Sequence, residues 1–212
     1  MDIRSVSELV SGGEFEFDLK YRISYSSGME ISNEKIKQLL FECYKYAELH
    51  SDDKSNQNAA MILNPNIDNY GEYFAIVSNC LPKGVIKTDE RIYKRPMKYA
   101  FIEHAERGVI YEAARMGVST YNTTMVCPWI ACENCARAIV CAGIKKVIAH
   151  KQRIAATSLN RDKVKDTVDN RWVNPVSDGD IIIKEGGVEV FYYDGTIDGL
   201  NILVNEQIMN AI

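Results

Sequence analysis

The sequence predicts an α/β fold in which a mixed five-stranded sheet is covered by helices. Two observations carry this prediction. Short apolar runs of strand length alternate with longer segments of helical periodicity, and glycines or polar turns separate them. The expected order from residue 34 is α-β-β-α-β-α-β, then an insert, then β-α. Strands joined through helices run parallel with right-handed crossovers, whereas a hairpin between the first two strands would make them antiparallel.

The helices are predicted from apolar stripes and from their end signals. The first helix follows Ser32 or Asn33, either of which can cap it. Its apolar stripe consists of Ile36, Leu39, Leu40, Cys43 and Ala47. The other predicted helices cover about 102–116, ended by Gly117, then 131–143, ended by Gly143, and finally 197–208.

Five strands are predicted from short apolar or alternating runs. They cover residues 59–64, 73–79, 119–129, 145–150 and 187–194. Residues 64–72 are rich in Asn and Gly and are expected to form a turn. Residues 80–99 are expected to be an irregular loop, and the polar residues 151–186 an insert with no assigned element. Residues 1–33 form an N-terminal addition, in which residues 14–26 alternate well enough for an edge strand or a hairpin.

Composition places the chain among ordinary globular proteins. Its 212 residues, 46% of them hydrophobic, are enough for one domain at 34–212 with an addition at 1–33. The net charge of −4 argues against a protein that coats nucleic acid. No stretch is apolar enough to span a bilayer, and the start lacks a signal-peptide pattern, so we expect a cytoplasmic protein. We expect core thiols at Cys43, Cys80, Cys127 and Cys141 and end-of-element residues at His50 and His150.

A histidine and two cysteines are spaced as ligands of one zinc ion. Cys132 and Cys135 form a C-x-x-C in the first turn of a predicted helix, so both sulfur atoms can reach the same ion. The positive end of a helix also stabilises thiolate charge. His104 lies at the start of the preceding helix, and both starts are expected at the sheet edge where parallel strands end. A catalytic zinc site uses three such ligands and leaves the fourth position to water.

Glu106 follows His104 by two residues and has a role that a ligand could not fill. A carboxylate beside a three-ligand zinc ion can take a proton from the bound water and return it to a leaving nitrogen. Plainer interpretations stay open: a surface helix for the histidine motif, and buried thiols or a structural site, with Cys127 as fourth ligand, for the cysteines. The occurrence of both motifs in order on strand–helix units favours the catalytic site.

The residues around both motifs resemble the zinc-dependent cytidine and deoxycytidylate deaminase superfamily, and within it the dCMP deaminase branch. "IEHAERGVIYEAARMG" and "CENCARAIVCAGIKKVIAH" are similar to the family's two helical motifs, and "SNCLPKGV" to the loop after its second strand. The resemblance covers residues 34–150 well and the last third poorly. It implies a three-layer cytidine-deaminase-like fold with an insert at 151–186. It also implies Zn²⁺ as cofactor and the hydrolysis of dCMP to dUMP and ammonia.

The resemblance further implies substrate contacts. Asn79 would bind the nucleotide, although a turn residue at a strand end is the plainer interpretation. The backbone N–H of Ala105 would bind the pyrimidine carbonyl. Trp129 and Ile130 would lie near the base, although Trp129 fits a core or a subunit interface equally well. Asn56 lies in a segment that often contributes to phosphate or sugar binding in the family.

Two residues depart from the family pattern, and one loop is basic. Ala131 stands where the family usually has proline before the first cysteine, and Gly108 stands where it often has asparagine. A glycine inside a helix costs about 1 kcal/mol against alanine, so we expect either close packing or altered contacts at Gly108. Phosphate ligands are expected in the loop before His104, where the alternative is a solvated basic loop. Its cations are Lys83, Arg91, Lys94 and Arg95.

Alternative functions stay open at this stage. The same chemistry could act on cytosine, cytidine, a modified dCMP, guanine or an RNA base, and the acidic pI argues against RNA. A non-catalytic zinc module for assembly is the second class, against which the intact Glu106 argues. The resemblance implies a homo-oligomer, commonly a hexamer, and regulation by an effector such as dCTP or dTTP, although the sequence shows no allosteric site.

Overall fold

The computed structural model describes residues 31–63, 73–158 and 173–212. The helices there are α1 (Asn33–His50), α2 (Asp89–Ile92), α3 (Met97–Phe101), α4 (Ala105–Met116), α5 (Glu133–Cys141), α6 (Lys151–Ser158) and α7 (Val173–Glu185). The strands are β1 (Ala59–Leu63), β2 (Tyr73–Ser78), β3 (Thr124–Val126), β4 (Lys146–His150), β5 (Glu189–Tyr193), β6 (Asp198–Val204) and β7 (Gln207–Ala211). The strand or hairpin expected at 14–26 and the turn expected at 64–72 lie outside the described residues.

The predicted mixed sheet is confirmed. Within the described ranges, five strands pair in the order β2-β1-β3-β4-β5. β1 is antiparallel to both of its neighbours, as the predicted hairpin with β2 requires. β3, β4 and β5 run parallel, so their carboxyl ends meet at one edge of the sheet. That edge is where ligands bind in open α/β sheets.

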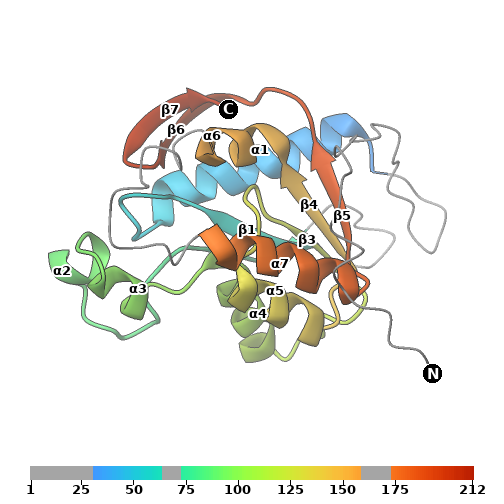
Figure 1. The fold of residues 1–212 in the computed structure, drawn as a ribbon, viewed down its shortest axis with the longest axis horizontal. Helices are drawn as coiled ribbons and strands as arrows, with labels where there is room; N and C mark the ends of the chain where they lie inside the picture. The colour runs from blue at the N-terminus through green and yellow to red at the C-terminus, as the bar shows by residue number, and fades with distance from the viewer. Residues whose placement is uncertain (1–30, 64–72, 159–172) are drawn as a thin grey trace. The chain divides into compact units, whose positions relative to one another are not determined.

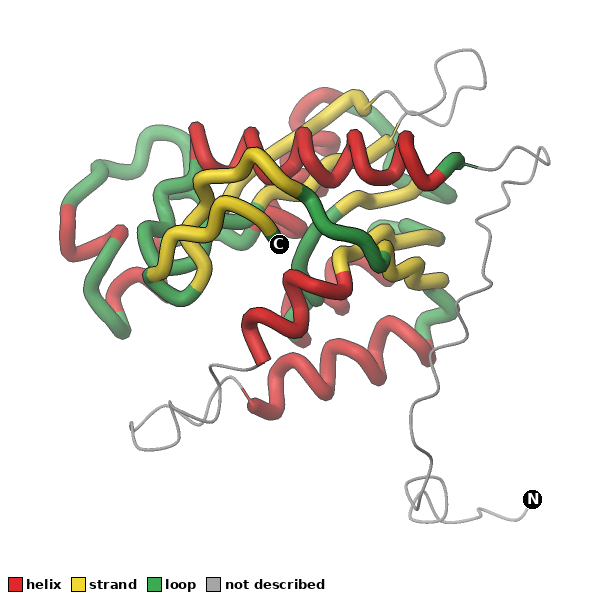
Figure 2. Tube along the Cα trace, turned by 90° about the horizontal axis from the view of Figure 1, so that it is seen from above, coloured by secondary structure: helices red, strands yellow, loops and turns green. Residues whose placement is uncertain are grey.

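Helices cover the sheet on both faces. Figure 1 shows α4, α5 and α7 on one side of the sheet and α1 on the other. α1 contacts all five strands, and the view from above shows it as the long helix lying across them (Figure 2). On the opposite face Val109, Ile139 and Ile183, one from each covering helix, join a buried cluster with sheet residues. No helix among the described residues has the length and apolarity needed to cross a membrane.

The first helix forms as predicted. Ser32 is its N-cap, and the hydroxyl oxygen accepts a hydrogen bond from the backbone N–H of Lys35 at 3.2 Å. The predicted apolar stripe is buried, and Tyr44 is buried with it. Gly117 ends α4 in the left-handed conformation with φ 70°, also as predicted.

The predicted closing helix at 197–208 is wrong, because this segment forms the hairpin β6–β7. Leu200, Ile202 and Val204 are buried while the residues between them are more exposed, which is the period of a strand. Asn205 and Glu206 between the strands have φ values of 49° and 65°, as a two-residue turn of the mirror-image type requires. The hairpin packs against α1.

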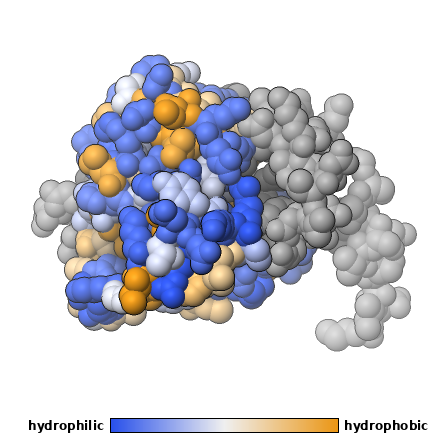
Figure 3. Space-filling model, turned by 90° about the vertical axis from the view of Figure 1, so that its left-hand side faces the viewer, coloured by the Kyte–Doolittle hydropathy of each residue, from blue (hydrophilic) through white to orange (hydrophobic). Residues whose placement is uncertain are grey.

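Other boundaries also differ from the prediction: the strand expected at 119–129 is limited to Thr124–Val126, and the helix expected at 131–143 covers Glu133–Cys141. The loop at 80–99 contains the short helix α2 and the start of α3, and the insert at 151–186 contains α6 and α7. α4 begins at Ala105 rather than near Ile102, because His104 has the extended backbone of an N-cap. The face that carries β6–β7, α2 and α3 is mainly hydrophilic, with hydrophobic residues in separate spots (Figure 3).

α7 packs closely against the segment that leads into α5. Gly179 is buried in α7, and a Cβ there would collide with the backbone oxygen of Ala131 and lie 3.0 Å from the carbonyl carbon of Cys132. Gly108 in α4 is close to a side chain instead, because its Cβ would lie 2.9 Å from Cγ1 of Val77. Close packing therefore accounts for glycine at both positions, but only Gly179 faces backbone that cannot rotate away.

Gly179→Ala and Gly108→Ala form a matched pair of helix substitutions. Alanine in a helix normally stabilises by about 1 kcal/mol over glycine. We expect Gly179→Ala to lower the free energy of unfolding by about 1–3 kcal/mol, because overpacking against fixed backbone outweighs that gain. Gly108→Ala should change it less, since Val77 can shift. Urea unfolding of both variants measures this, and a Gly179→Ala protein as stable as the wild type would contradict the close approach.

His150 connects α1, the sheet and the loop after β5 inside the core. Its Nε2 lies 2.7 Å from the carbonyl oxygen of Gly195, which can only accept, so Nε2 carries the hydrogen. Nδ1 then accepts from the hydroxyl of Tyr44 at 2.7 Å in the neutral ring. Burial lowers the pKa of His150, and the nearby guanidinium of Arg153 lowers it further. The neutral ring is therefore the form that the core stabilises.

This lowered pKa makes stability depend on pH in a defined direction. The unfolded histidine has a pKa of about 6.5, so the unfolded chain binds a proton more readily than the folded one. The contribution of neutral His150 to the free energy of unfolding is complete above about pH 6.5, the pKa of the unfolded histidine, and is lost as the pH falls through the lower pKa of the folded state. His150→Gln keeps one donor and one acceptor without titrating. We expect its loss of stability between pH 7 and 5 to be smaller than in wild type, whereas the exposed His50→Gln should follow wild type.

Candidate active site

The structure brings His104, Cys132 and Cys135 together as one cluster. Their ligand atoms all lie within 4.8 Å of one another. Nδ1 of His104 is 3.6 Å from Sγ of Cys132 and 3.5 Å from Sγ of Cys135. A tetrahedral zinc ion with ordinary Zn–S and Zn–N bonds separates such atoms by about 3.6 Å. The donor set and its spacing therefore fit Zn²⁺ with three protein ligands.

Two helix starts bring these ligands to one point. His104 is the N-cap of α4, and Cys132 is the N-cap of α5, with Cys135 one turn later. Both N-cap residues have extended backbones, and neither side chain makes the usual cap hydrogen bond. Their side chains are therefore left for the cluster. The chain before His104 is fixed by an isolated bridge between Cys80 and Glu103, which holds the end of β2 beside the start of α4.

Without a metal the surroundings favour thiolate at Cys132, whereas the hydrogen bond that Cys135 makes to Cys132, together with burial, raises the pKa of Cys135. A hydrogen bond from Cys135 and the contact with His104 lower the pKa of Cys132 to about 3, although burial opposes the shift. Nη1 of Arg107 lies 3.8 Å from Sγ of Cys135, and the same guanidinium is paired with Glu103. A cation beside a ligand sulfur stabilises its negative charge. The low pKa of Cys132 and the cation beside Cys135 therefore suit the binding of a divalent cation by thiolate ligands.

Glu106 is buried in the first turn of α4, close to the cluster. Only 4% of it is exposed, and burial raises the pKa of its carboxyl group. A raised pKa brings a carboxylate closer to the range in which it can both accept and donate a proton near neutral pH. Its burial and raised pKa are compatible with the proton transfer predicted from the sequence, and that role stays a prediction.

Glu106 also lines a pocket whose empty space, including the part open to solvent, is about 420 Å³. Trp129, Ile130 and Ala131 form the wall that follows β3, and most of the remaining lining is apolar. Asp180 of α7 and Tyr192 of β5 also line it. A mostly apolar lining with a few polar groups is typical of small-molecule sites.

The predicted contact residues fall into two groups. Trp129 and Ile130 line the pocket with Glu106, as a base site would require. Asn79, Ala105 and Asn56 bond to one another instead. The N–H of Ala105 donates to Oδ1 of Asn79 at 2.9 Å, and Nδ2 of Asn79 donates to the backbone oxygen of Asn56 at 3.1 Å. A pyrimidine carbonyl at Ala105 would have to share or displace the first of these bonds.

The cations of the loop before His104 have partners within the protein. Arg91 donates to the backbone oxygen of Ile86 and stacks on Phe101, with its guanidinium carbon 4.3 Å from the ring centroid. Lys94 pairs with Glu90 on the surface, and Arg95 pairs with Glu206 in the hairpin turn. Lys83 is exposed. The expectation of phosphate ligands in this loop therefore stays a prediction, since most of its cations already balance carboxylates or pack on aromatic rings.

The remaining cysteines differ in burial. Cys43 and Cys127 are buried, and burial raises the pKa of both thiols. Cys127 accepts from Nδ2 of Asn58 at 3.3 Å and is not part of the metal-binding cluster. Cys80 is half-buried, and the expectation of a core thiol is wrong for Cys141, which is exposed at the end of α5.

Sequence reasoning missed several residues around the site. Asp180 and Gly179 come from the insert, where no periodic pattern marked a helix that closes the pocket. Arg107 follows the histidine motif directly, and its position one residue after the proton carrier was a signal that could have been used. The buried pair of Lys98 with Asp53 joins two segments that are far apart in sequence, so no local pattern indicates it.

Comparisons with known proteins agree with this geometry. The family model described as the cytidine and deoxycytidylate deaminase zinc-binding region matches residues 33–151. The dCMP deaminase from cyanophage S-TIM5 in complex with dCMP and dUMP superposes with a TM-score of 0.55 and 19% identity, covering 76% of this chain and 98% of that chain. Its apo form gives a TM-score of 0.53 with 20% identity, covering 76% and 99%.

A more distant likeness is to the diaminohydroxyphosphoribosylaminopyrimidine deaminase/5-amino-6-(5-phosphoribosylamino)uracil reductase from Thermotoga maritima. Its TM-score is 0.48 with 18% identity, covering 76% of this chain and 37% of that chain. No curated protein matches the sequence. The cyanophage structures show the cytidine-deaminase-like fold, as expected. Because the zinc-binding region matches more than half of the residues, the chain belongs to the cytidine and deoxycytidylate deaminase family.

Proposed function

We propose that the protein hydrolyses dCMP to dUMP and ammonia. The observation that carries the proposal is the cluster of His104, Cys132 and Cys135 close to the buried Glu106, which also lines a pocket. Membership of the deaminase family supports the reaction type. The choice of dCMP is supported by the likeness in fold to a deaminase that was solved with dCMP and dUMP.

The proposed steps assign each proton to a named group. His104, Cys132 and Cys135 would hold zinc, which would lower the pKa of a water molecule to about 7 and supply hydroxide near neutral pH. Glu106 accepts the proton released and delivers it to ring N3, while the hydroxide oxygen forms a bond to C4. Glu106 then takes the proton of the new C4 hydroxyl group and transfers it to the amino nitrogen, so that the C4–N4 bond breaks, C4 becomes a carbonyl and ammonia leaves. Trp129 and Ile130 exclude water and hold the base against the carboxyl group.

The apolar wall of the pocket suits a flat heterocycle, and the polar lining residues Asp180 and Tyr192 suit a polar substituent. Aromatic and aliphatic side chains bind the faces of a base without selecting its identity. Oligomeric assembly and a nucleoside triphosphate effector stay predictions from the family resemblance.

Glu106→Gln tests the proton carrier while keeping the shape of the side chain. We expect metal content to stay as in wild type and turnover to fall by at least about 100-fold, because general acid–base catalysis is lost. Glu112→Gln is the matched control, since Glu112 is in the same helix and pairs with the exposed Arg115. Ammonia release and zinc analysis measure both properties, and a Glu106→Gln enzyme of near wild-type turnover would refute the assigned role.

Cys132→Ser tests the metal site in the same way. We expect zinc bound per chain to fall sharply and stability to fall with it, because a hard hydroxyl replaces a thiolate ligand. Cys141→Ser, at the exposed end of the same helix, should bind zinc as wild type does. Elemental analysis after dialysis against a chelator gives the comparison, and equal zinc retention in both variants would contradict the assigned ligand.

A substrate panel tests the choice of dCMP. We expect ammonia release from dCMP to exceed that from dCTP, cytidine, cytosine and guanine in kcat/KM. Faster release from guanine or cytosine would assign the same chemistry to another amine. Zinc-loaded protein that acts on none of them would favour the assembly module and overturn the proposal.

A further inference from the structure

The start of α4 lacks the cap that its own N-cap residue would normally supply. The first N–H groups of a helix have no partner within the helix, and an N-cap side chain usually accepts from one of them. His104 occupies that position, yet its ring faces the two cysteines and makes no cap bond. A metal ligand placed at the N-cap leaves this requirement to another residue.

Asn79 meets the requirement from outside the helix. Its Oδ1 accepts from the N–H of Ala105, the first residue of α4, at 2.9 Å. The bridge between Cys80 and Glu103 brings Asn79 to this place, because it pairs the residue after Asn79 with the residue two positions before Ala105. The side chain is enclosed, with 5% of Asn79 exposed.

The orientation of the Asn79 amide is determined by its second bond. Nδ2 donates to the backbone oxygen of Asn56 at 3.1 Å, and a carbonyl oxygen can only accept. A flipped amide would place oxygen against oxygen at Asn56 and nitrogen against the N–H of Ala105. The Asn56 carbonyl therefore directs the amide oxygen of Asn79 toward α4.

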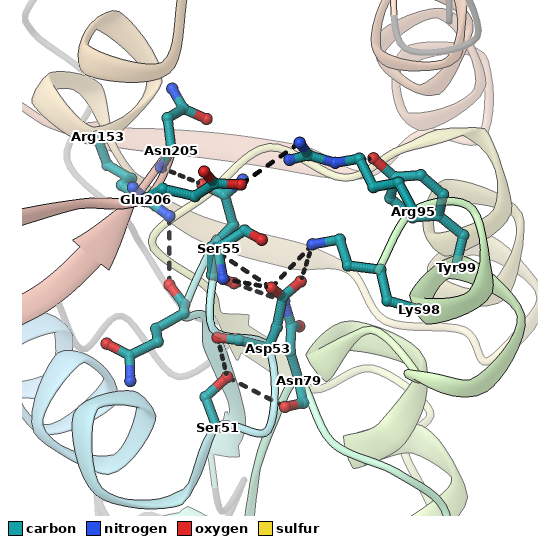
Figure 4. A network of polar contacts seen from close by, with 12 residues as sticks. Ser51, Asp53, Ser55, Asn79, Arg95, Lys98, Tyr99, Arg153, Asn205 and Glu206 are labelled. Carbon is teal, nitrogen blue, oxygen red and sulfur yellow. Dashed lines mark hydrogen bonds and ion pairs between the residues drawn. The ribbon is translucent and has the colours of Figure 1, made fainter. Parts of the chain in front are cut away.

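The segment that presents this carbonyl is held by other elements. Asp53 accepts from Nζ of Lys98 with both carboxylate oxygens at 2.9 Å, and Figure 4 shows Lys98 reaching it from α3. The backbone N–H of Asn205, in the hairpin turn, donates to Oδ1 of Asn56 at 2.9 Å. Glu206 N–H donates to the backbone oxygen of Ser55 at 2.8 Å. The polar loop at 51–58 is thus fixed from α3 and from the hairpin.

We propose that Asn79 is a positioning residue for the metal site. Its amide oxygen accepts from the first of the N–H groups that α4 leaves without a partner in the helix, and so holds the first turn of α4, next to His104 and with Glu106, in one orientation. Asn56 and the hairpin turn hold Asn79 in the required rotamer. The effect on catalysis rests on the proposed function, whereas the effect on the helix start does not.

This role differs from a direct contact with substrate. Oδ1 of Asn79 accepts from Ala105 and one N–H of Nδ2 donates to Asn56, so a substrate could bind the remaining N–H or lone pair only with the side chain kept in this orientation. Breaking either bond would leave a buried polar group unpaired, which is unfavourable. A positioning residue affects turnover and the metal geometry, while a substrate contact affects KM.

Three variants separate the two roles. Asn79→Ala removes the cap and the donor, and Asn79→Asp keeps an acceptor for Ala105 but loses the donor to Asn56. Asn201→Ala, at an exposed asparagine in β6, is the matched control. Each is compared with wild type by hydrogen exchange of the Ala105 amide, by the visible spectrum of the cobalt-substituted protein, and by kcat and KM for dCMP. Urea unfolding confirms that each variant is folded.

We expect the Ala105 amide in Asn79→Ala to exchange at least about fivefold faster than in wild type, since a cap bond is lost. The cobalt bands should shift, and kcat should fall by about tenfold or more with KM little changed, because a small displacement of reacting groups has a large effect on rate. Asn79→Asp should recover most of the protection and part of kcat, and the control should match wild type.

Unchanged exchange and cobalt bands in Asn79→Ala, with KM raised in both Asn79 variants, would overturn the proposal in favour of substrate contact. The first two measurements need no substrate. If wild-type protein released no ammonia from dCMP while Asn79→Ala still lost protection at Ala105 and shifted the cobalt bands, the positioning role would stand and the proposed function would fail. Should Asn79→Ala not fold, the same readouts on Asn79→Asp decide, with KM alone changed as the refuting result.

Discussion

The whole site depends on two helices beginning at the same place. His104 and Cys132 are both N-cap residues, so their side chains lie where the chain turns from extended to helical backbone. The parallel strands β3 and β4 and the bridge at Cys80 set where those turns occur. Moving either helix along its axis by one residue, about 1.5 Å, would separate the ligands by more than a coordination bond tolerates. The rigidity of the sheet is therefore a condition of the chemistry.

The residues that line the pocket come from two different parts of the chain, and the predicted metal ligands come from the first of them. The ligands and Glu106 come from the region that matches the family, residues 33–151. Asp180 and Tyr192 come from α7 and β5, beyond that match. The second region contributes these two polar residues to the lining, and α7 packs closely on the metal-binding segment at Gly179. Part of the pocket lining is thus contributed by the part of the chain that lies beyond the family match.

The sequence correctly predicted features that depend on residues close together in the chain. The stripe of α1, the C-x-x-C turn and the hairpin of β1 with β2 are each set by residues a few positions apart, and each is present. Strand β6 was predicted as a helix because "LNILV" is too short to distinguish the helical period from the strand period. The alternating burial of Leu200, Ile202 and Val204, which identifies a strand, depends on packing against α1. The side of α7 that faces Cys132 is likewise a property of packing between distant segments.

The polar loop at 51–58 shows why such packing matters to a metal site. A core of apolar contacts would tolerate small rotations of α4, because dispersion has little directional preference. Hydrogen bonds do not, since an amide or carboxylate fixes both distance and angle. The buried pair of Lys98 and Asp53 contributes little net stability, because desolvation offsets its attraction. The pair instead fixes the position of the loop relative to α3, and a carbonyl group of this loop orients Asn79. Directional bonds in an enclosed place therefore determine where the ligand-bearing turn can begin.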